Sequence, residues 1–432
     1  MRLPLSQKRL MQQSLTITVV TLLMNTAHAT SEQDELQQLK MEVKELRTLI
    51  ERYQVQTLQT HNTSAQVVLP SVVRPAPLQA TSSAAKEGLQ LTTAAGSEFN
   101  LYGFLRADVQ YQAKGGSSIF NRIDDVALDD AHQDKMYSSV ATSRLGLDFK
   151  KQLGQDKVGG KIEVDFRGSN DTLRIRHAYL TYNNWLFGQT TSTFVATDLM
   201  PEMLDFNTNL GGATYRNKMV RYQNKITPQT EYFVALEEAN DGLSSTKTSI
   251  PALTAKLKYN FADNKGTSSL RGLVTERKTE DDSTLAWGVG LGAAYQLSND
   301  LRIMADYYHV EGDGKFVLYS NDSYLIHPAT QKIEKNVFDS VAVGATYQLN
   351  SKLRSTLGYG VMLSEDNAFA QIALQNRDSN QNQRLQQAWF NVMYSPVNPL
   401  TFGVEYVYGE RETFTGEKGQ DNRVGAMAKY TF

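Results

Sequence analysis

The 432-residue chain contains no cysteine. This absence excludes disulfide bonds, thiolate metal sites, cysteine nucleophiles and an N-terminal lipidated cysteine. The chain has only six histidines, none of them in an HxxxH, HExxH or HxH pair, so neither a histidine-rich metal site nor a cofactor is predicted. The formal net charge of −2 is too balanced to indicate nucleic-acid binding.

Long hydrophobic runs are also missing beyond the N-terminus, which excludes a transmembrane helix there but not a transmembrane β-barrel. At the N-terminus, three basic residues precede an uncharged, fairly apolar stretch over 14–24, and Ala27-His28-Ala29 matches a small-x-small cleavage site. Residues 1–29 are therefore predicted to be a signal peptide cut after Ala29. The alternative is a short buried helix.

Residues 30–59 predict a helix that associates with copies of itself. The stretch 32–59 lacks glycine and proline, and its apolar residues alternate at spacings of three and four, which is a heptad pattern. The core positions of this predicted coiled coil are Leu36, Leu39, Val43, Leu46, Ile50 and Tyr53. So short a coil is marginal alone, and the pattern does not decide between two and three strands. The alternative is an amphipathic helix packed on its own domain.

Residues 60–96 are rich in alanine, serine, threonine and proline and are predicted to be a flexible linker. From 97 to 432 the pattern changes to the period of two that is typical of strands. In the last stretch, for example, Val424, Ala426 and Ala428 lie on one face, with Arg423 and Met427 on the other.

Three features favour contact with lipid over a soluble β-sandwich. Aromatic residues recur at strand ends on the apolar face, short turns alternate with long polar loops, and two stretches of about 20 residues echo each other. The pattern predicts an all-β membrane protein, a 16-stranded antiparallel transmembrane β-barrel over 97–432, with 14 or 18 strands left open. The fifth strand, 185–189, is the shortest. A barrel of 16 strands is too wide for its side chains to fill, so the fold implies a water-filled pore.

Alternation places more basic than acidic residues on the lumen face. Residues of the basic set predicted to line the solute path and to select anions are Arg106, Arg144, Lys161, Arg174, Arg176, Arg221, Arg271, Arg354 and Arg423. The long segment 190–213 is predicted to fold into the lumen as a constriction loop, with acidic residues Asp198, Glu202 and Asp205. The alternative for each arginine is a solvated lumen residue paired with a carboxylate, which adds no selectivity.

The export signal with its heptad helix, the stretch FNLYGFLRADVQYQ that opens the barrel, and the terminal Phe432 together resemble the DcaP-like outer-membrane porins of Gram-negative bacteria. The resemblance implies a homotrimer of 16-stranded porins in the outer membrane, with its coiled coil in the periplasm. It also implies a preference for small anionic solutes, dicarboxylic acids among them. Phe432 would be read by the outer-membrane assembly machinery.

Two other classes of protein compete with a channel. An outer-membrane hydrolase would need a nucleophile with a nearby base, but the sequence has no GxSxG motif and no histidine in such a context. A structural or adhesion barrel would use the heptad segment as a tether. The sequence therefore predicts a porin that is not an enzyme.

Overall fold

The computed structural model describes Lys44 and the residues 88–93, 96–129, 131–205, 210, 215–239, 241–247, 249–317 and 321–432. Apart from Lys44, the predicted signal peptide and coiled-coil helix lie outside the described residues. None of the helices among the described residues combines the length and the apolar character that crossing a membrane requires.

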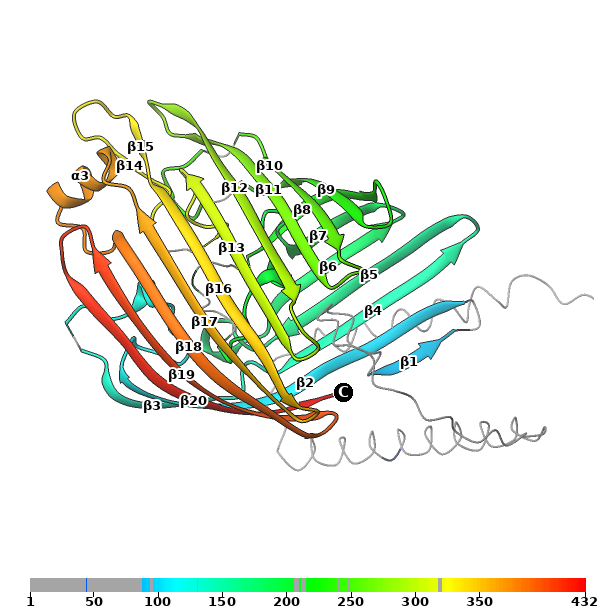
Figure 1. The fold of residues 1–432 in the computed structure, drawn as a ribbon. Coiled ribbons are helices and arrows are strands. Elements are labelled where there is room, and N and C mark those ends of the chain that lie inside the picture. The colour runs from blue at the N-terminus through cyan, green and yellow to red at the C-terminus, as the bar shows by residue number, and fades with distance from the viewer. Residues whose placement is uncertain are drawn as a thin grey trace, which may run out of the picture. The chain divides into compact units, whose positions relative to one another are not determined.

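The described chain forms one antiparallel sheet that closes on itself, because β20 pairs with β2 (Figure 1). Its wall is made of β2 (Ser97–Lys114), β3 (Gln133–Ser139), β4 (Arg144–Leu153), β5 (Asp156–Asp165), β6 (Arg174–Tyr182), β7 (Trp185–Thr191), β8 (Arg216–Lys225), β9 (Thr230–Glu237), β10 (Ala252–Phe261), β11 (Gly266–Lys278), β12 (Ser283–Gln296), β13 (Leu301–Glu311), β16 (Val337–Asn350), β17 (Leu353–Ser364), β18 (Asn382–Val397), β19 (Leu400–Thr413) and β20 (Lys418–Thr431).

Two of these segments, β3 and β4, lie one after the other along the same edge of β2. β3 pairs with residues 108–114 of β2, and β4 pairs with residues 97–104 of the same strand. Counted as one interrupted strand, they bring the wall to the 16 strands that the sequence predicts. The short fifth strand is also confirmed, as β7.

Alternation along each strand separates the two faces of the wall. In β2, Leu101, Leu105 and Val109 are exposed on the outside, whereas Arg106 and Asp108 are buried on the inside. Apolar side chains that face outward all round a closed sheet satisfy the two demands of a bilayer, a hydrocarbon-compatible surface and no unpaired backbone edge.

Short turns join the strands at one end of the barrel, and both ends of the wall lie there. The β10–β11 turn is of this kind, with Ala262, Asp263 and Asn264 in the left-handed region at φ 50–66°. Beside it, Phe261 stacks on Tyr295 with ring centroids 5.9 Å apart. Such rings fit the interfacial girdle expected at a membrane surface. The long loops lie at the other end, where outer-membrane barrels face the outside.

One part of the predicted linker is regular structure. Residues Leu89–Thr92 form β1, which pairs with residues 98–101 of β2. The prediction of a flexible linker up to residue 96 is wrong here for a physical reason. β20 ends opposite Phe104, so the lower edge of β2 would otherwise keep unpaired backbone groups. β1 pairs with the part of this edge that β20 does not reach.

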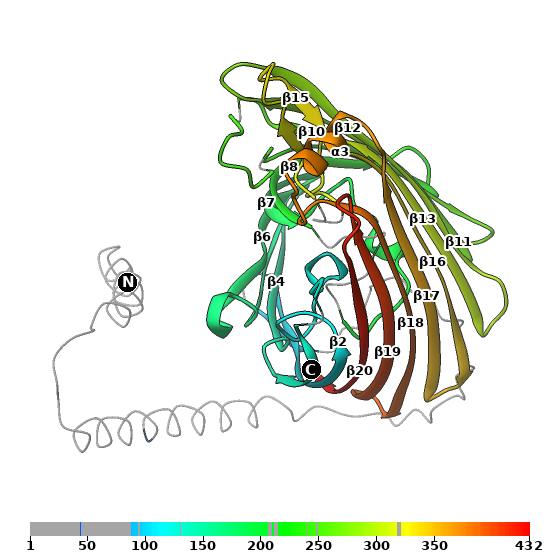
Figure 2. The same ribbon diagram turned by 90° about the vertical axis from the view of Figure 1, so that its left-hand side faces the viewer.

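The extracellular half of the lumen contains a hydrophobic core built by loops. Ile123 and Val126 come from the β2–β3 loop, Phe194 from the β7–β8 loop and Phe316 from the β13–β16 loop, and all pack on inward residues of the wall such as Tyr308. In Figure 2, cyan and green loop segments lie between the two walls of strands. The barrel is therefore partly filled, and its water-accessible path is narrower than the strand count alone implies.

Further elements lie in the loops at this end. They are the hairpin β14 (Tyr324–Ile326) and β15 (Ile333–Lys335), the helix α3 (Ala368–Gln375), and the 3-10 turns η1 (Ile123–Asp125), η2 (Ser169–Asp171) and η3 (Thr197–Leu199).

Candidate permeation pathway

The β7–β8 loop, predicted as the constriction loop, is described over 192–205 and is tied to the inner wall at both ends. Glu237 of β9 accepts hydrogen bonds from the backbone N–H of Thr193 (2.8 Å) and from Ser192 Oγ (3.1 Å). At the far end, Glu405 of β19 accepts from the backbone N–H of Leu204 (2.7 Å). The loop therefore lies inside the barrel, between walls that are distant in the sequence.

The three acidic residues predicted in this loop each pair with a basic residue of the wall. Asp198 accepts from Lys258 Nζ at 2.5 Å, and Asp205 lies 3.3 Å from a guanidinium nitrogen of Arg423. Glu202 receives a two-pronged contact from Arg354, with both N–O distances 2.7 Å. The loop carboxylates are thus neutralised by the β10–β20 side of the wall.

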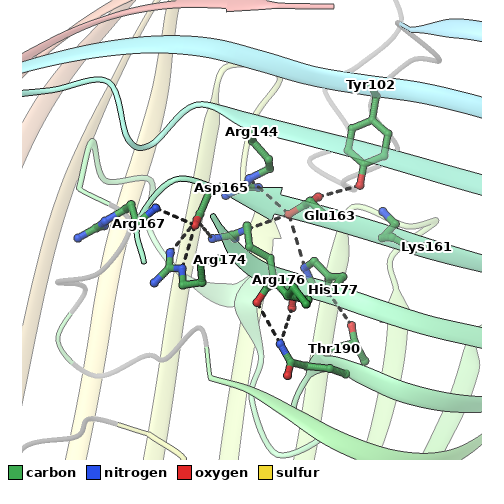
Figure 3. A network of polar contacts seen from close by, with 12 residues as sticks. Tyr102, Arg144, Lys161, Glu163, Asp165, Arg167, Arg174, Arg176, His177 and Thr190 are labelled. Carbon is green, nitrogen blue, oxygen red and sulfur yellow. Dashed lines mark hydrogen bonds and ion pairs between the residues drawn. The ribbon is translucent and has the colours of Figure 1, made fainter. Parts of the chain in front are cut away.

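A second cluster of charges lies on the β4–β6 wall (Figure 3). Arg174 donates to both oxygens of Asp165, at 2.9 and 2.6 Å. Arg176 bridges two carboxylates, because its Nε donates to Glu163 (2.8 Å) and its Nη1 to Asp165 (2.9 Å). Arg144 Nε lies 3.3 Å from Glu163. Three of the predicted selectivity residues therefore form one cluster, as strand order implies.

Two arginines that the prediction omits from the site join this cluster. Arg167, in the loop after β5, and Arg216, at the start of β8, lie close enough to Arg174 to interact with its charge. Alternation along β8 would place Arg216 on the outer face, but Arg216 is the first residue of the strand, where alternation is a weak guide to the direction of a side chain. Five guanidiniums, counting these two, surround the two carboxylates of β5, and Asp205 of the constriction loop also lies near Arg167. Five guanidiniums against three carboxylates leave the cluster with a net positive charge.

A β-bulge brings one more side chain into the cluster. The β5–β6 register shifts between Glu163 and Val164, so that Arg176 is an extra residue and both it and His177 face inward. His177 Nδ1 lies 2.9 Å from Thr190 Oγ1, and its Nε2 lies 3.8 Å from Glu163. Strict alternation along β6 would place His177 on the apolar outer face, and the bulge turns it inward instead.

The other basic residues of the predicted path fall into two groups. Lys161 contacts Asp148 at 3.3 Å and lies over the Tyr102 ring, while Arg221 lies over the Phe233 ring. By contrast, three of the nine are covered: Arg106, Arg271 and Arg423 have relative exposures of 4%, 2% and 1%.

These covered arginines form hydrogen bonds with loops and with the inner wall. Arg106 donates to the backbone oxygen of Leu204 (2.6 Å), Arg423 to that of Asn121 (3.0 Å), and Arg271 to the hydroxyl of Tyr308 (2.6 Å). Alternation identifies their inward face correctly, but it cannot tell which inward residues a loop will cover.

Loops of the extracellular mouth enclose a polar cavity of about 630 Å³ whose lining includes Asp124, Asp322 and Arg411. Asp124 is buried beside Arg122 at 3.1 Å, and the desolvation of its carboxylate raises its pKa to about 7. Desolvation also raises the pKa of Asp322. Part of the negative charge at this entrance is thereby suppressed.

Wide closed barrels with an apolar outer band and a polar, partly open lumen are channels of the bacterial outer membrane. Within that class, the chain belongs to the DcaP outer membrane protein family, whose family model matches residues 27–432.

Solved structures agree with this assignment. The outer membrane channel DcaP of Acinetobacter baumannii is 45% identical, with a TM-score of 0.75 over 79% of this chain and 99% of that one. OmpT of Vibrio cholerae (15% identity, TM-score 0.53, 80% and 100% covered) and Salmonella typhi OmpF in complex with daunomycin (16%, 0.54, 80% and 100%) share the fold. A search of curated proteins finds no match.

Proposed function

We propose that the protein is a diffusion channel for small hydrophilic solutes that prefers anions, dicarboxylic acids among them. The observation that carries the proposal is the excess of guanidinium groups over carboxylates around Glu163 and Asp165. A cationic wall in a narrow lumen raises the local concentration of anions, and the guanidinium fork matches a carboxylate.

The constriction loop strengthens the effect of this wall. Its hydrogen bonds run from Glu237 of β9 to Glu405 of β19, and we expect solutes to pass on the β4–β8 side of the lumen. Its carboxylates are paired with Lys258, Arg354 and Arg423, and of the three only Asp205 also acts on an arginine of the cluster, Arg167. Solutes are thereby directed along the arginines.

Solute uptake into liposomes that contain the purified protein tests this proposal. We expect succinate to enter faster than a neutral sugar of similar size, and both to enter faster than a diamine. The physical reason is that the arginine cluster attracts the dianion and repels the dication. A diamine that enters faster than succinate would contradict the proposed selectivity.

We further propose that three copies of the chain assemble side by side through the β4–β9 wall. Its strands have only 7–10 residues, whereas those from β11 to β20 and β2 have 11–18, leaving aside β3 and the loop hairpin. A tilted strand of 7 residues rises roughly 16–18 Å, less than the apolar band of about 25 Å. The exposed polar loop with Asn170 and Asp171 lies at this low rim, where contact with lipid would be costly.

In this assembly the predicted coiled coil of residues 30–59 lies in the periplasm, at the short-turn end. Three helices tethered to three barrels are held at a high effective concentration, which offsets their shortness. Native mass spectrometry of the protein purified from outer membranes checks the assembly. We expect the mass of three chains that each begin at Thr30, the residue after the proposed cleavage site. A single-chain mass would contradict the homotrimer, and a longer chain the cleavage site.

A further inference from the structure

The two carboxylates at the centre of the arginine cluster are unusually well supplied with donors. Asp165 accepts from Arg174, from Arg176 and from the backbone N–H of Arg167 (3.2 Å). Glu163 accepts from Arg176 and from the hydroxyl of Tyr102 at 2.7 Å. The exposed fractions of the Asp165 and Glu163 side chains are only 3% and 7%, while the Arg174 side chain is 33% exposed.

The spacing of these carboxylates resembles that of a short dicarboxylic acid. Glu163 and Asp165 are two residues apart on one face of β5, which separates their backbones by about 6.6 Å. Each lies where a solute carboxylate would lie to bind the same arginines. The protein thus holds its own pair of anions at the point where passing anions are expected to bind.

Arg174 and Arg176 have further N–H groups that can donate hydrogen bonds. Among the described residues, the hydrogen bonds of Arg174 use Nε and Nη2, and those of Arg176 use Nε and Nη1. Their remaining N–H groups are available to a solute carboxylate. A solute therefore shares these guanidiniums with Asp165 and Glu163 rather than binding them alone.

We propose that Glu163 and Asp165 are resident counter-anions that compete with solute carboxylates for Arg174 and Arg176 and so set how long an anion stays in the channel. The inference rests on the proposed anion selectivity and deepens it. A channel conducts only if binding is strong enough to admit a solute and weak enough to release it. Without these carboxylates, five guanidiniums would trap a dianion; with them, each guanidinium is already partly neutralised.

The test is the block of single-channel chloride current by succinate in planar bilayers, with the full mature protein. Asp165→Asn keeps the side-chain shape but removes the competing charge. We expect the dissociation constant of succinate to fall about tenfold, mostly through longer block events, because one charge-assisted contact no longer competes. Glu163→Gln is expected to act in the same direction and serves as the second variant if Asp165→Asn does not fold.

A matched control separates competition within the cluster from a general change in the charge of the protein. Glu280 pairs with Lys247 in exposed loops, away from the lumen. Glu280→Gln adds the same unit of charge and is expected to change the dissociation constant of succinate less than twofold.

The outcomes separate this inference from the proposed function. If the carboxylates only position the arginines, Asp165→Asn weakens succinate block or leaves it unchanged, and the inference is overturned. An equal tightening by Glu280→Gln also overturns it. If the unaltered channel prefers cations and shows no block by succinate, the proposed function itself fails.

Discussion

Replacing Arg174 and Arg176 together by glutamate is expected to turn an anion-preferring channel into one that prefers cations. Both arginines point into the lumen from β6, and the substitution changes the local charge by four units beside Glu163 and Asp165. Because like charges then line the path, succinate entry is expected to fall about tenfold relative to a neutral sugar.

Bilayer zero-current potentials and liposome uptake measure these two effects. A matched control carries the same charge change outside the lumen. Lys247 in an exposed loop and Lys418 at the start of β20 are ion-paired, with 52% and 71% of their side chains accessible. Their double replacement by glutamate should leave the selectivity unchanged. Equal losses of succinate and sugar uptake in the Arg174/Arg176 variant would indicate a damaged pore and would contradict a role in selection.

Removing residues 194–203 and joining the ends with two glycines is expected to widen the channel. This segment lies across the lumen between Glu237 and Glu405, and Phe194 helps to fill the extracellular half. Once it is gone, a barrel of 16 strands leaves an open aqueous channel, so the single-channel conductance should rise about twofold or more. Larger sugars should also enter, and the preference for anions should weaken because solutes pass farther from the arginines.

Conductance steps in concentrated KCl check this prediction. Replacing the exposed pair Lys247 and Glu280 by alanine alters two extracellular loops without touching the lumen, so it is the control and should leave the conductance unchanged. A loop-shortened channel with the conductance of the unaltered protein would show that the segment does not restrict the path.

The barrel could be predicted from the sequence because every spanning strand repeats one simple constraint. Alternation along stretches such as 284–297, together with one short and one long connection per pair of strands, determines the wall and the number of strands. The inward face of Arg144, Arg174 and Arg354 follows from the same rule. These are local properties, and a closed sheet in a bilayer leaves few alternatives.

Departures from the prediction arise where local alternation meets tertiary packing. The bulge at Arg176 reverses the assignment of His177, and nothing in the residues of β6 signals it. Arg271 is buried with Asp306 and Tyr308 of β13, and Tyr308 in turn accepts a hydrogen bond from Ala196 of the β7–β8 loop. No period in the sequence encodes this packing. The strand β1 forms because the neighbouring edge is empty, not because LQLT is a strong strand former.

The partly filled lumen also changes how the basic residues are interpreted. An inward arginine can hold a loop, as Arg106 and Arg354 do, or remain partly exposed in the lumen, as Arg174 does. Charge counted over the whole inner face therefore overstates the field along the path. For the proposed anion preference, the relevant excess of basic over acidic residues is the one around Glu163 and Asp165.

The zero-current potential of the unaltered protein across a KCl gradient is the sharpest test of its anion preference. With a single purified channel in a neutral bilayer at low salt, where screening is weakest, we expect a potential of the sign set by chloride. We also expect the potential to move toward zero as salt screens the arginines. A potential of the sign set by potassium would show that the arginine cluster does not select anions.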